Sequence, residues 1–237
     1  MYVGVVDRLK LSWHRDLASH PVTHAWVLNL YRAGEQHPET VDDYFPYQHA
    51  PWPELAANIK RHAGDERRHT VLYAKAIERM GGAVVELGGW DVFNRVIREH
   101  TPRGFAIADD DAPDVKREQL GHFLAHAHCL ERRVLRSVEY HAEACAQLGR
   151  REEASLVEKV HADEARHVSY SKEAVFELLG RREALAAFEL HGRAEAAADR
   201  AFSAFQVRVF MDQHARHVPL SRRLVYTACA ALMQGMA

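Results

Sequence analysis

GDERRH at residues 64–69 and ADEARH at residues 162–167 are two copies of nearly the same polar hexapeptide. Each contains the pattern Asp-Glu-x-Arg-His, in which a Glu and a His are three residues apart. On a helix this spacing is about 300° of rotation, so the two side chains point the same way from adjacent turns. The repeat therefore predicts two helices that each carry a carboxylate and an imidazole on one face.

Apolar residues surround both copies at the three-and-four spacing of a buried helix face. The Glu and His of each copy, and also His62, fall on these apolar stripes. A buried carboxylate or imidazole without a partner is costly, and metal coordination would satisfy both copies at once. The stripes consist of Leu55, Ile59, Tyr73, Ile77 and Met80 around the first copy, and of Val157, Val160, Val175 and Leu178 around the second.

Glycine and proline are scarce and clustered, and they divide the chain into long helical segments. No segment has the pattern of a strand, and residues 83–112 are expected to form a long crossover. The arrangement predicts an all-α four-helix bundle with one long crossover and additional C-terminal helices. We expect helices from Pro21 to about 36, at about 53–80, 113–148, 152–179 and 181–216, and after Pro219.

A four-helix di-metal site needs two further carboxylates, one from each of the other two helices. Glu35 and Glu131 lie on the apolar faces of their helices, whereas Glu118 and Glu139 have more polar neighbours. The separations also match, because Glu35 precedes Glu66 by 31 residues and Glu131 precedes Glu164 by 33. The two halves are thus offset by 96–98 residues, as in a duplicated helical hairpin.

Other polar residues near the predicted ligands leave alternatives open. Pro38 follows Glu35 closely and should end or kink the first helix, which loosens the backbone at this ligand. His128 precedes Glu131 by one turn, and we favour a hydrogen-bonded bundle histidine over an added ligand. Tyr73 and Tyr170 lie one turn past the two motif histidines, where packing is favoured over a hydrogen bond to the site.

The layout Glu35, Glu66-x-x-His69, Glu131 and Glu164-x-x-His167 resembles the ferritin-like di-iron carboxylate superfamily over about residues 17–180. The doubled Asp-Glu-x-Arg-His motif is similar to that of its oxygen-activating members. This resemblance implies that these six residues ligate two metal ions and carry the catalysis. It also implies that each motif Asp hydrogen-bonds a ligating His of the opposite motif, and that each Arg supports an Asp. The supporting residues would be Asp65, Asp163, Arg68 and Arg166.

The resemblance implies a non-haem di-iron oxidoreductase that activates dioxygen at a Glu4His2 site and oxidises a small organic substrate. Apolar stretches after residue 180 suit an apolar substrate, a packing role or a dimer interface equally. Two Fe ions are expected, with two Mn or mixed Mn/Fe as the alternative. No flavin or iron–sulfur motif is visible, so an external donor such as a ferredoxin or flavin reductase would supply electrons. The alternatives are a di-manganese catalase or peroxide-scavenging oxidase, and a non-enzymatic iron-binding or storage protein.

Composition gives an ordinary globular balance, with 47% hydrophobic and 27% charged residues among 237 and a net charge of −2. We therefore expect one domain over residues 1–237, and no nucleic-acid or membrane partner. The bundle would span about 17–180 and be covered by helices at about 181–237. Three cysteines without CxxC and no secretory signal pattern favour a cytoplasmic protein, as monomer or homodimer.

Overall fold

The computed structural model describes residues 4–35, 45–87, 96, 99–101 and 106–236, and all regular structure within them is helical. The all-α prediction is confirmed for this part of the chain. The helices are α1 (Val5–Ser19), α2 (Pro21–Glu35), α4 (Pro53–Arg79), α6 (Pro113–Gln147), α7 (Arg151–His214) and α8 (Leu220–Gly235), with short 3-10 helices η1 (Tyr47–His49) and η2 (Ala215–His217).

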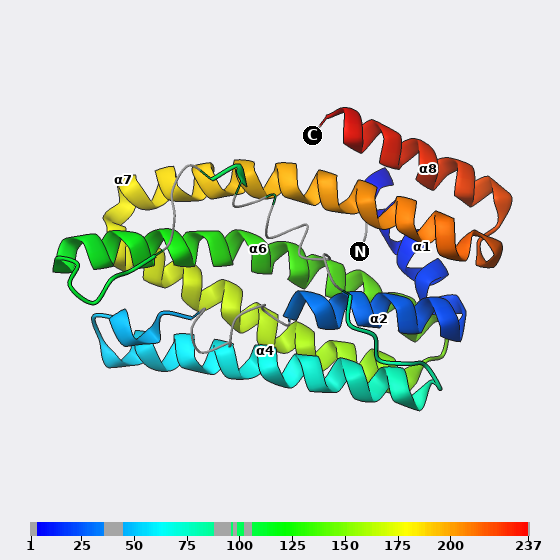
Figure 1. The fold of residues 1–237 in the computed structure, drawn as a ribbon, viewed down its shortest axis with the longest axis horizontal. Helices are drawn as coiled ribbons and strands as arrows, with labels where there is room; N and C mark the ends of the chain where they lie inside the picture. Colours follow the sequence, from blue (N-terminus) through cyan, green and yellow to red (C-terminus); the bar gives the residue numbers. More distant parts are fainter. Residues whose placement is uncertain (1–3, 36–44, 88–95, 97–98, 102–105, 237) are drawn as a thin grey trace.

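The helices pack as two long pairs, α2 with α4 and α6 with α7 (Figure 1). α4 also contacts α7, which joins the two pairs. Prolines open α2, α4 and α6, where a missing backbone N–H costs nothing, so the predicted starts of these helices match the observed ones. No helix in the described residues is both long enough and apolar enough to cross a lipid bilayer.

α7 is one 64-residue element that bends at Gly180. Gly180 has φ 73° and ψ 170°, a conformation that glycine adopts readily because it has no Cβ. The two helices predicted at about 152–179 and 181–216 are therefore the two arms of α7, with no connecting loop between them. Figure 1 shows the chain changing direction between these arms, so that the second arm runs back alongside α6.

α1 is a helix that the sequence interpretation did not include. It packs against α2 and α6, and its buried Trp13 and Leu17 join a cluster with Phe210 of α7 and Tyr226 of α8. Trp13 meets both of these rings edge-on, at centroid distances of 4.9 and 5.0 Å. The N-terminal helix thus packs onto the C-terminal helices, at the far end of the sequence.

The predicted crossover at 83–112 contains no long helix in its described portions. Its start is fixed to α2, because the Asn29 side chain donates to the carbonyl of Ala83 and accepts from the amide of Val85. Residues 88–95, 97–98 and 102–105 lie outside the described residues. So does Pro38, and α2 is described as far as Glu35.

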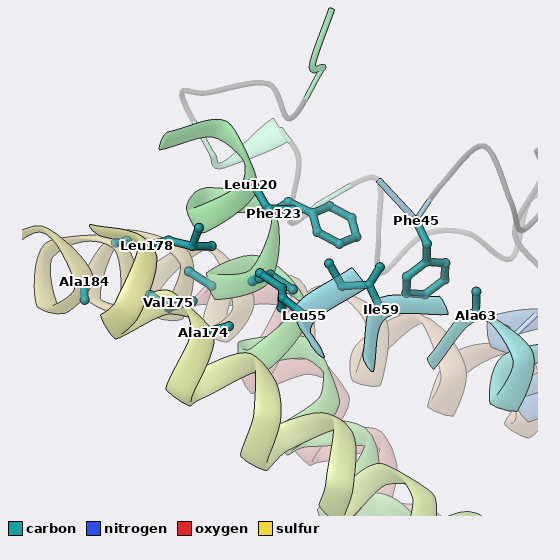
Figure 2. Close-up of a cluster of buried hydrophobic side chains, with 13 residues drawn as sticks. Phe45, Leu55, Ile59, Ala63, Leu120, Phe123, Ala174, Val175, Leu178 and Ala184 are labelled. Carbon is teal, nitrogen blue, oxygen red and sulfur yellow. The ribbon is translucent and has the colours of Figure 1, made fainter. Parts of the chain in front are cut away.

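Two apolar clusters lie on either side of the repeated hexapeptides. The first includes Ile59 and Ala63 of α4, just before Glu66, with partners from α6 and α7 (Figure 2). The second includes Tyr73 and Ile77, just after His69, with Val138 of α6 and Val157 and Val160 of α7. The polar residues of α4 and α7 are therefore enclosed between two layers of apolar packing, which shields them from water.

Candidate metal centre

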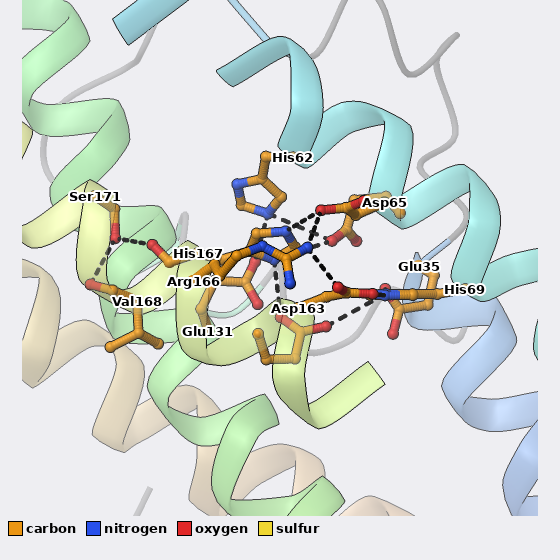
Figure 3. A network of polar contacts seen from close by, with 12 residues as sticks. Glu35, His62, Asp65, His69, Glu131, Asp163, Arg166, His167, Val168 and Ser171 are labelled. Atoms are coloured by element: carbon orange, nitrogen blue, oxygen red, sulfur yellow. Dashed lines mark hydrogen bonds and ion pairs between the residues drawn. The ribbon is translucent and has the colours of Figure 1, made fainter. Parts of the chain in front are cut away.

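Seven buried carboxylates and imidazoles meet where α2, α4, α6 and the first arm of α7 come together (Figure 3). None is more than 7% exposed. All six ligands expected from the sequence belong to this group, which also contains one further histidine of α4. The seven residues are Glu35 of α2, His62, Glu66 and His69 of α4, Glu131 of α6, and Glu164 and His167 of α7.

The seven residues form two adjacent groups that share Glu66. One group contains Glu35, Glu66, His69 and Glu164, and the other contains His62, Glu66, Glu131 and His167. Within each group the ligand atoms lie within 4.8 Å of one another, close enough to hold one metal ion. Because Glu66 belongs to both, its carboxylate is placed to contact two neighbouring ions.

The motif histidines turn the same ring nitrogen toward the carboxylates. Nδ1 of His69 lies 3.4 Å from Oε2 of Glu35 and 3.4 Å from Oε1 of Glu164. Nδ1 of His167 lies 3.1 Å from Oε2 of Glu164 and 3.7 Å from Oε1 of Glu66. Both Nδ1 atoms are therefore the nitrogens available to a metal ion.

The other ring nitrogen of each histidine faces an aspartate on the opposite helix. Nε2 of His69 lies 3.0 Å from Oδ2 of Asp163, and Nε2 of His167 lies 3.2 Å from Oδ2 of Asp65. A carboxylate in this position holds the proton on Nε2, which leaves the Nδ1 lone pair directed inward. The two hexapeptides thus orient each other's imidazoles.

Arg68 and Arg166 each contact both aspartates. Arg68 lies 2.7 Å from Oδ1 of Asp65 and also bonds Asp163, while Arg166 lies 3.1 Å from Oδ2 of Asp65 and also bonds Asp163. Burial by itself raises the pKa of Asp65, but hydrogen bonds from His167 and Arg68 outweigh it and lower the pKa. The same balance, with His69 and both arginines, lowers the pKa of Asp163. Both aspartates are therefore anionic acceptors for the imidazole N–H groups.

His62 belongs to the site but was not among the six ligands predicted from the sequence. Its Nε2 lies 3.2 Å from Oε1 of Glu131 and 3.4 Å from Oε1 of Glu66. Its ring stacks on that of His167 with centroids 3.6 Å apart, and its Nδ1 shares a 2.8 Å hydrogen bond with the hydroxyl of Tyr170. The signal was its place on the apolar stripe of α4, one turn before Glu66.

The sequence left two interpretations for each of three further residues, and the structure shows different roles for them. Tyr170 hydrogen-bonds the site through His62, whereas packing was the favoured expectation. Tyr73 is buried among apolar residues, as its favoured interpretation predicted. His128 lies 3.0 Å from the carbonyl of Val168 and 3.4 Å from the hydroxyl of Ser171, so it is a hydrogen-bonded bundle histidine.

The buried carboxylates are not all anionic when no cation balances them. Burial raises the pKa of Glu35 and of Glu66 to about 7 and raises that of Glu164 well above its usual value. For Glu131, burial is outweighed by the hydrogen bond with His62, which lowers the pKa. Burial also lowers the pKa of His62, but its neighbours Tyr170, Glu131 and Glu66 outweigh burial and raise it well above normal.

Two carboxylate oxygens in the site accept no hydrogen bond from the described residues, Oε1 of Glu66 and Oε1 of Glu164. Buried acceptors are nearly always satisfied in folded proteins, and a metal ion satisfies such oxygens without a donor. The donor set of carboxylates and imidazoles suits iron, manganese or zinc. The site therefore has the composition and burial to hold metal ions.

A cavity of about 810 Å³ adjoins the site. Four of the seven candidate ligands form part of its wall, and most of the remaining wall is apolar and comes from α1, α6, α7 and α8. The ligands in the wall are Glu35, His62, Glu66 and Glu131, and apolar wall residues include Leu9, Phe202, Leu232 and Met233.

Comparison with known protein families, curated proteins and solved structures gives no match to this chain.

Proposed function

We propose that this chain is a ferritin-like di-iron oxidoreductase that activates dioxygen and oxidises an apolar organic substrate. The observation that carries the proposal is the sharing of Glu66 by two buried ligand groups, with His69 and His167 each oriented by an aspartate of the opposite helix. Duplicated ligand sets with a shared carboxylate are what two metal ions about 3.5–4 Å apart require.

Charge balance supports two divalent ions. The four glutamates carry four negative charges when ionised, which neutralises two divalent cations in a site that excludes water. Hard and intermediate donors favour iron or manganese over metals that prefer thiolates. Bound iron would supply electrons to dioxygen, a reaction that neutral carboxylate–imidazole sites permit.

The chain's own residues then have defined tasks. Asp65 and Asp163 hold the imidazole tautomers, and the two apolar clusters around the site exclude water. Glu35 and Glu66, with pKa values of about 7, release protons when cations bind. His62 joins the second ligand group and gives it an imidazole from α4 as well as from α7.

The cavity supports an organic substrate over the alternatives. A storage site or a catalase needs to admit only ions or peroxide, whereas about 810 Å³ beside Glu35, Glu66 and Glu131 accommodates an organic molecule. The mainly apolar wall favours an apolar substrate. Electrons for repeated turnover would come from a separate donor protein such as a ferredoxin or flavin reductase.

Anaerobic reconstitution with Fe²⁺ tests the proposal. We expect about two irons per chain and a change in visible absorption when oxygen is admitted. Glu131→Gln should lose metal, whereas Glu139→Gln, a half-buried glutamate on the same helix paired with Arg136, should retain it. Equal metal content in the two variants would refute the site.

Two further measurements separate the alternative functions. Rapid hydrogen peroxide turnover by the manganese-loaded chain without a reductant would indicate a catalase. Elution as a very large assembly that accumulates many irons per chain would indicate storage.

A further inference from the structure

A second buried cluster of metal-binding side chains lies outside the two groups that share Glu66. It consists of His24 of α2 and of His141 and Cys145, which are four residues apart on one face of α6. All three side chains are 0% exposed. The sequence interpretation assigned no role to any of them.

One ligand atom from each of the three residues lies within 4.8 Å of the others, and the two spacings from His24 match those around one ion. Nε2 of His24 lies 3.1 Å from Nε2 of His141 and 3.7 Å from Sγ of Cys145. A tetrahedral zinc with Zn–N of about 2.05 Å and Zn–S of about 2.3 Å places its nitrogens about 3.3 Å apart and nitrogen and sulfur about 3.6 Å apart. The observed spacings differ from these by a few tenths of an ångström.

Hydrogen bonds explain the close approach of these three ligand atoms less well than a bound metal ion does. Nε2 of His24 has either one proton or one lone pair, yet it faces both Nε2 of His141 and Sγ of Cys145. A single ion between the three atoms would use the lone pair of each nitrogen and the thiolate at once.

The surroundings suit neutral imidazole ligands. Burial lowers the pKa of His24 to about 2 and that of His141 to about 3, so both rings are uncharged at neutral pH. Burial raises the pKa of Cys145 to about 12, so its thiol keeps its proton until a cation displaces that proton to solvent. The charge of Arg150 also lowers the pKa of both histidines, whereas the charge of Glu153 raises the pKa of Cys145.

Neighbouring groups contact two of the three ligands, His141 and Cys145. The second nitrogen of His141, Nδ1, lies 3.4 Å from Nδ1 of His14, which also bonds the hydroxyl of Tyr31 at 3.2 Å. In the tautomer in which Nδ1 of His141 donates to Nδ1 of His14, Nε2 of His141 carries the lone pair. Ala18 and Ala154 pack with Cys145 and keep the site dry.

We propose that His24, His141 and Cys145 form a mononuclear site for one thiophilic transition-metal ion, Zn²⁺ or Cu⁺. Mixed imidazole and thiolate donors select these ions over iron and manganese, so the site differs in metal preference from the carboxylate-rich centre. The proposal does not depend on the proposed oxidoreductase function.

Cobalt is the probe, because a cobalt–thiolate bond gives a charge-transfer absorption band that carboxylate–imidazole coordination lacks. The metal-free full chain is titrated with Co²⁺, both as folded protein and during refolding, because the site is fully buried. We expect the band to saturate at one Co²⁺ per chain and to be lost when Zn²⁺ or Cu⁺ is added. The ion that displaces cobalt at the lower concentration is the preferred one.

Variants identify the thiolate. Cys145→Ser should lose the band, and Cys129→Ser, a half-buried cysteine on the same helix, should keep it. Absence of the band in the unmodified chain under both conditions would overturn the proposal, whatever the stability of the variants. Retention of the band in folded Cys145→Ser would overturn it as well, and would leave the cluster as a set of hydrogen-bonded neutral side chains.

Discussion

Nε2 of His69 lies 3.0 Å from Oδ2 of Asp163, a residue 94 positions later in the chain and on a different helix. The reciprocal contact joins His167 to Asp65 at 3.2 Å. Each hexapeptide therefore supplies an imidazole to the site and a carboxylate to the imidazole of the other hexapeptide. This exchange explains why the motif occurs twice, because one copy alone would leave its histidine without an orienting partner.

Asp163→Asn should weaken metal binding by about 10–100-fold, the usual effect of removing a carboxylate behind a ligating histidine. An amide accepts a hydrogen bond but carries no charge, so it makes the His69 imidazole a weaker donor. The dissociation constant for Fe²⁺ or Mn²⁺, measured anaerobically, checks this. Asp110→Asn, at an exposed aspartate, is the control and should bind as the parent does. Equal affinities in the two variants would show that the Asp163 contact is only structural.

Glu66→Gln should lose both metal ions, whereas Glu35→Gln should weaken one position more than the other. The reason is that Glu66 belongs to both ligand groups and Glu35 to only one. Metal content per chain after loading and desalting distinguishes the two outcomes. If Glu66→Gln retained a full complement, the two groups would not share this carboxylate.

The metal-free protein should show a pH-dependent stability difference between the parent and Glu35→Gln. The folded pKa of Glu35 is raised by burial to about 7, while an unfolded glutamate titrates near about 4.3. The stability contributed by the protonated carboxyl is therefore complete below about pH 4 and is lost as the pH rises through about 7.

Glutamine has no proton to lose, so the melting temperature of Glu35→Gln should rise relative to the parent between about pH 5 and pH 8. The comparison at each pH removes the contribution of the other titrating groups. A difference that stayed constant over this range would contradict the raised pKa of Glu35.

The sequence predicted the parts of the structure that depend on local helical geometry. Glu66 and His69 share a face because of their spacing, and Pro53 and Pro113 begin helices, so these features needed no tertiary information. The separation of about one hairpin between Glu35 and Glu66 likewise placed Glu35 opposite α4. All six predicted ligands lie together in the structure.

Other features depend on contacts between distant segments. α1 packs on Phe210 and Tyr226, about 200 residues away, and its own sequence does not show these contacts. His62 shared the apolar stripe with Glu66, but only the packing of α6 and α7 brings Glu131 and His167 to it. The cavity likewise arises from the assembly of several helices.

Replacement by alanine should have opposite effects on stability at two glycines of the long helices. At Gly192 of α7 an added Cβ meets nothing within 4 Å, and the backbone does not have positive φ. At Gly121 of α6 the Cβ would lie 2.6 Å from Cγ and Cδ2 of Leu179, the residue before the bend at Gly180. The first position has room for a methyl group, and the second uses glycine to bring α6 and α7 close together.

Gly192→Ala should therefore stabilise the fold by about 0.5–1 kcal/mol, since alanine loses less backbone entropy on folding than glycine. For a chain of this length the melting temperature should rise by about 1–4 °C. Gly121→Ala gains the same helix preference but must displace Leu179, and overpacking of this kind costs about 1–3 kcal/mol, so its melting temperature should fall. Thermal unfolding of both variants in metal-free buffer provides the measurement. Stabilisation by both substitutions would mean that α6 and α7 separate easily near Gly180, and that the contact between Gly121 and Leu179 does not fix the bend.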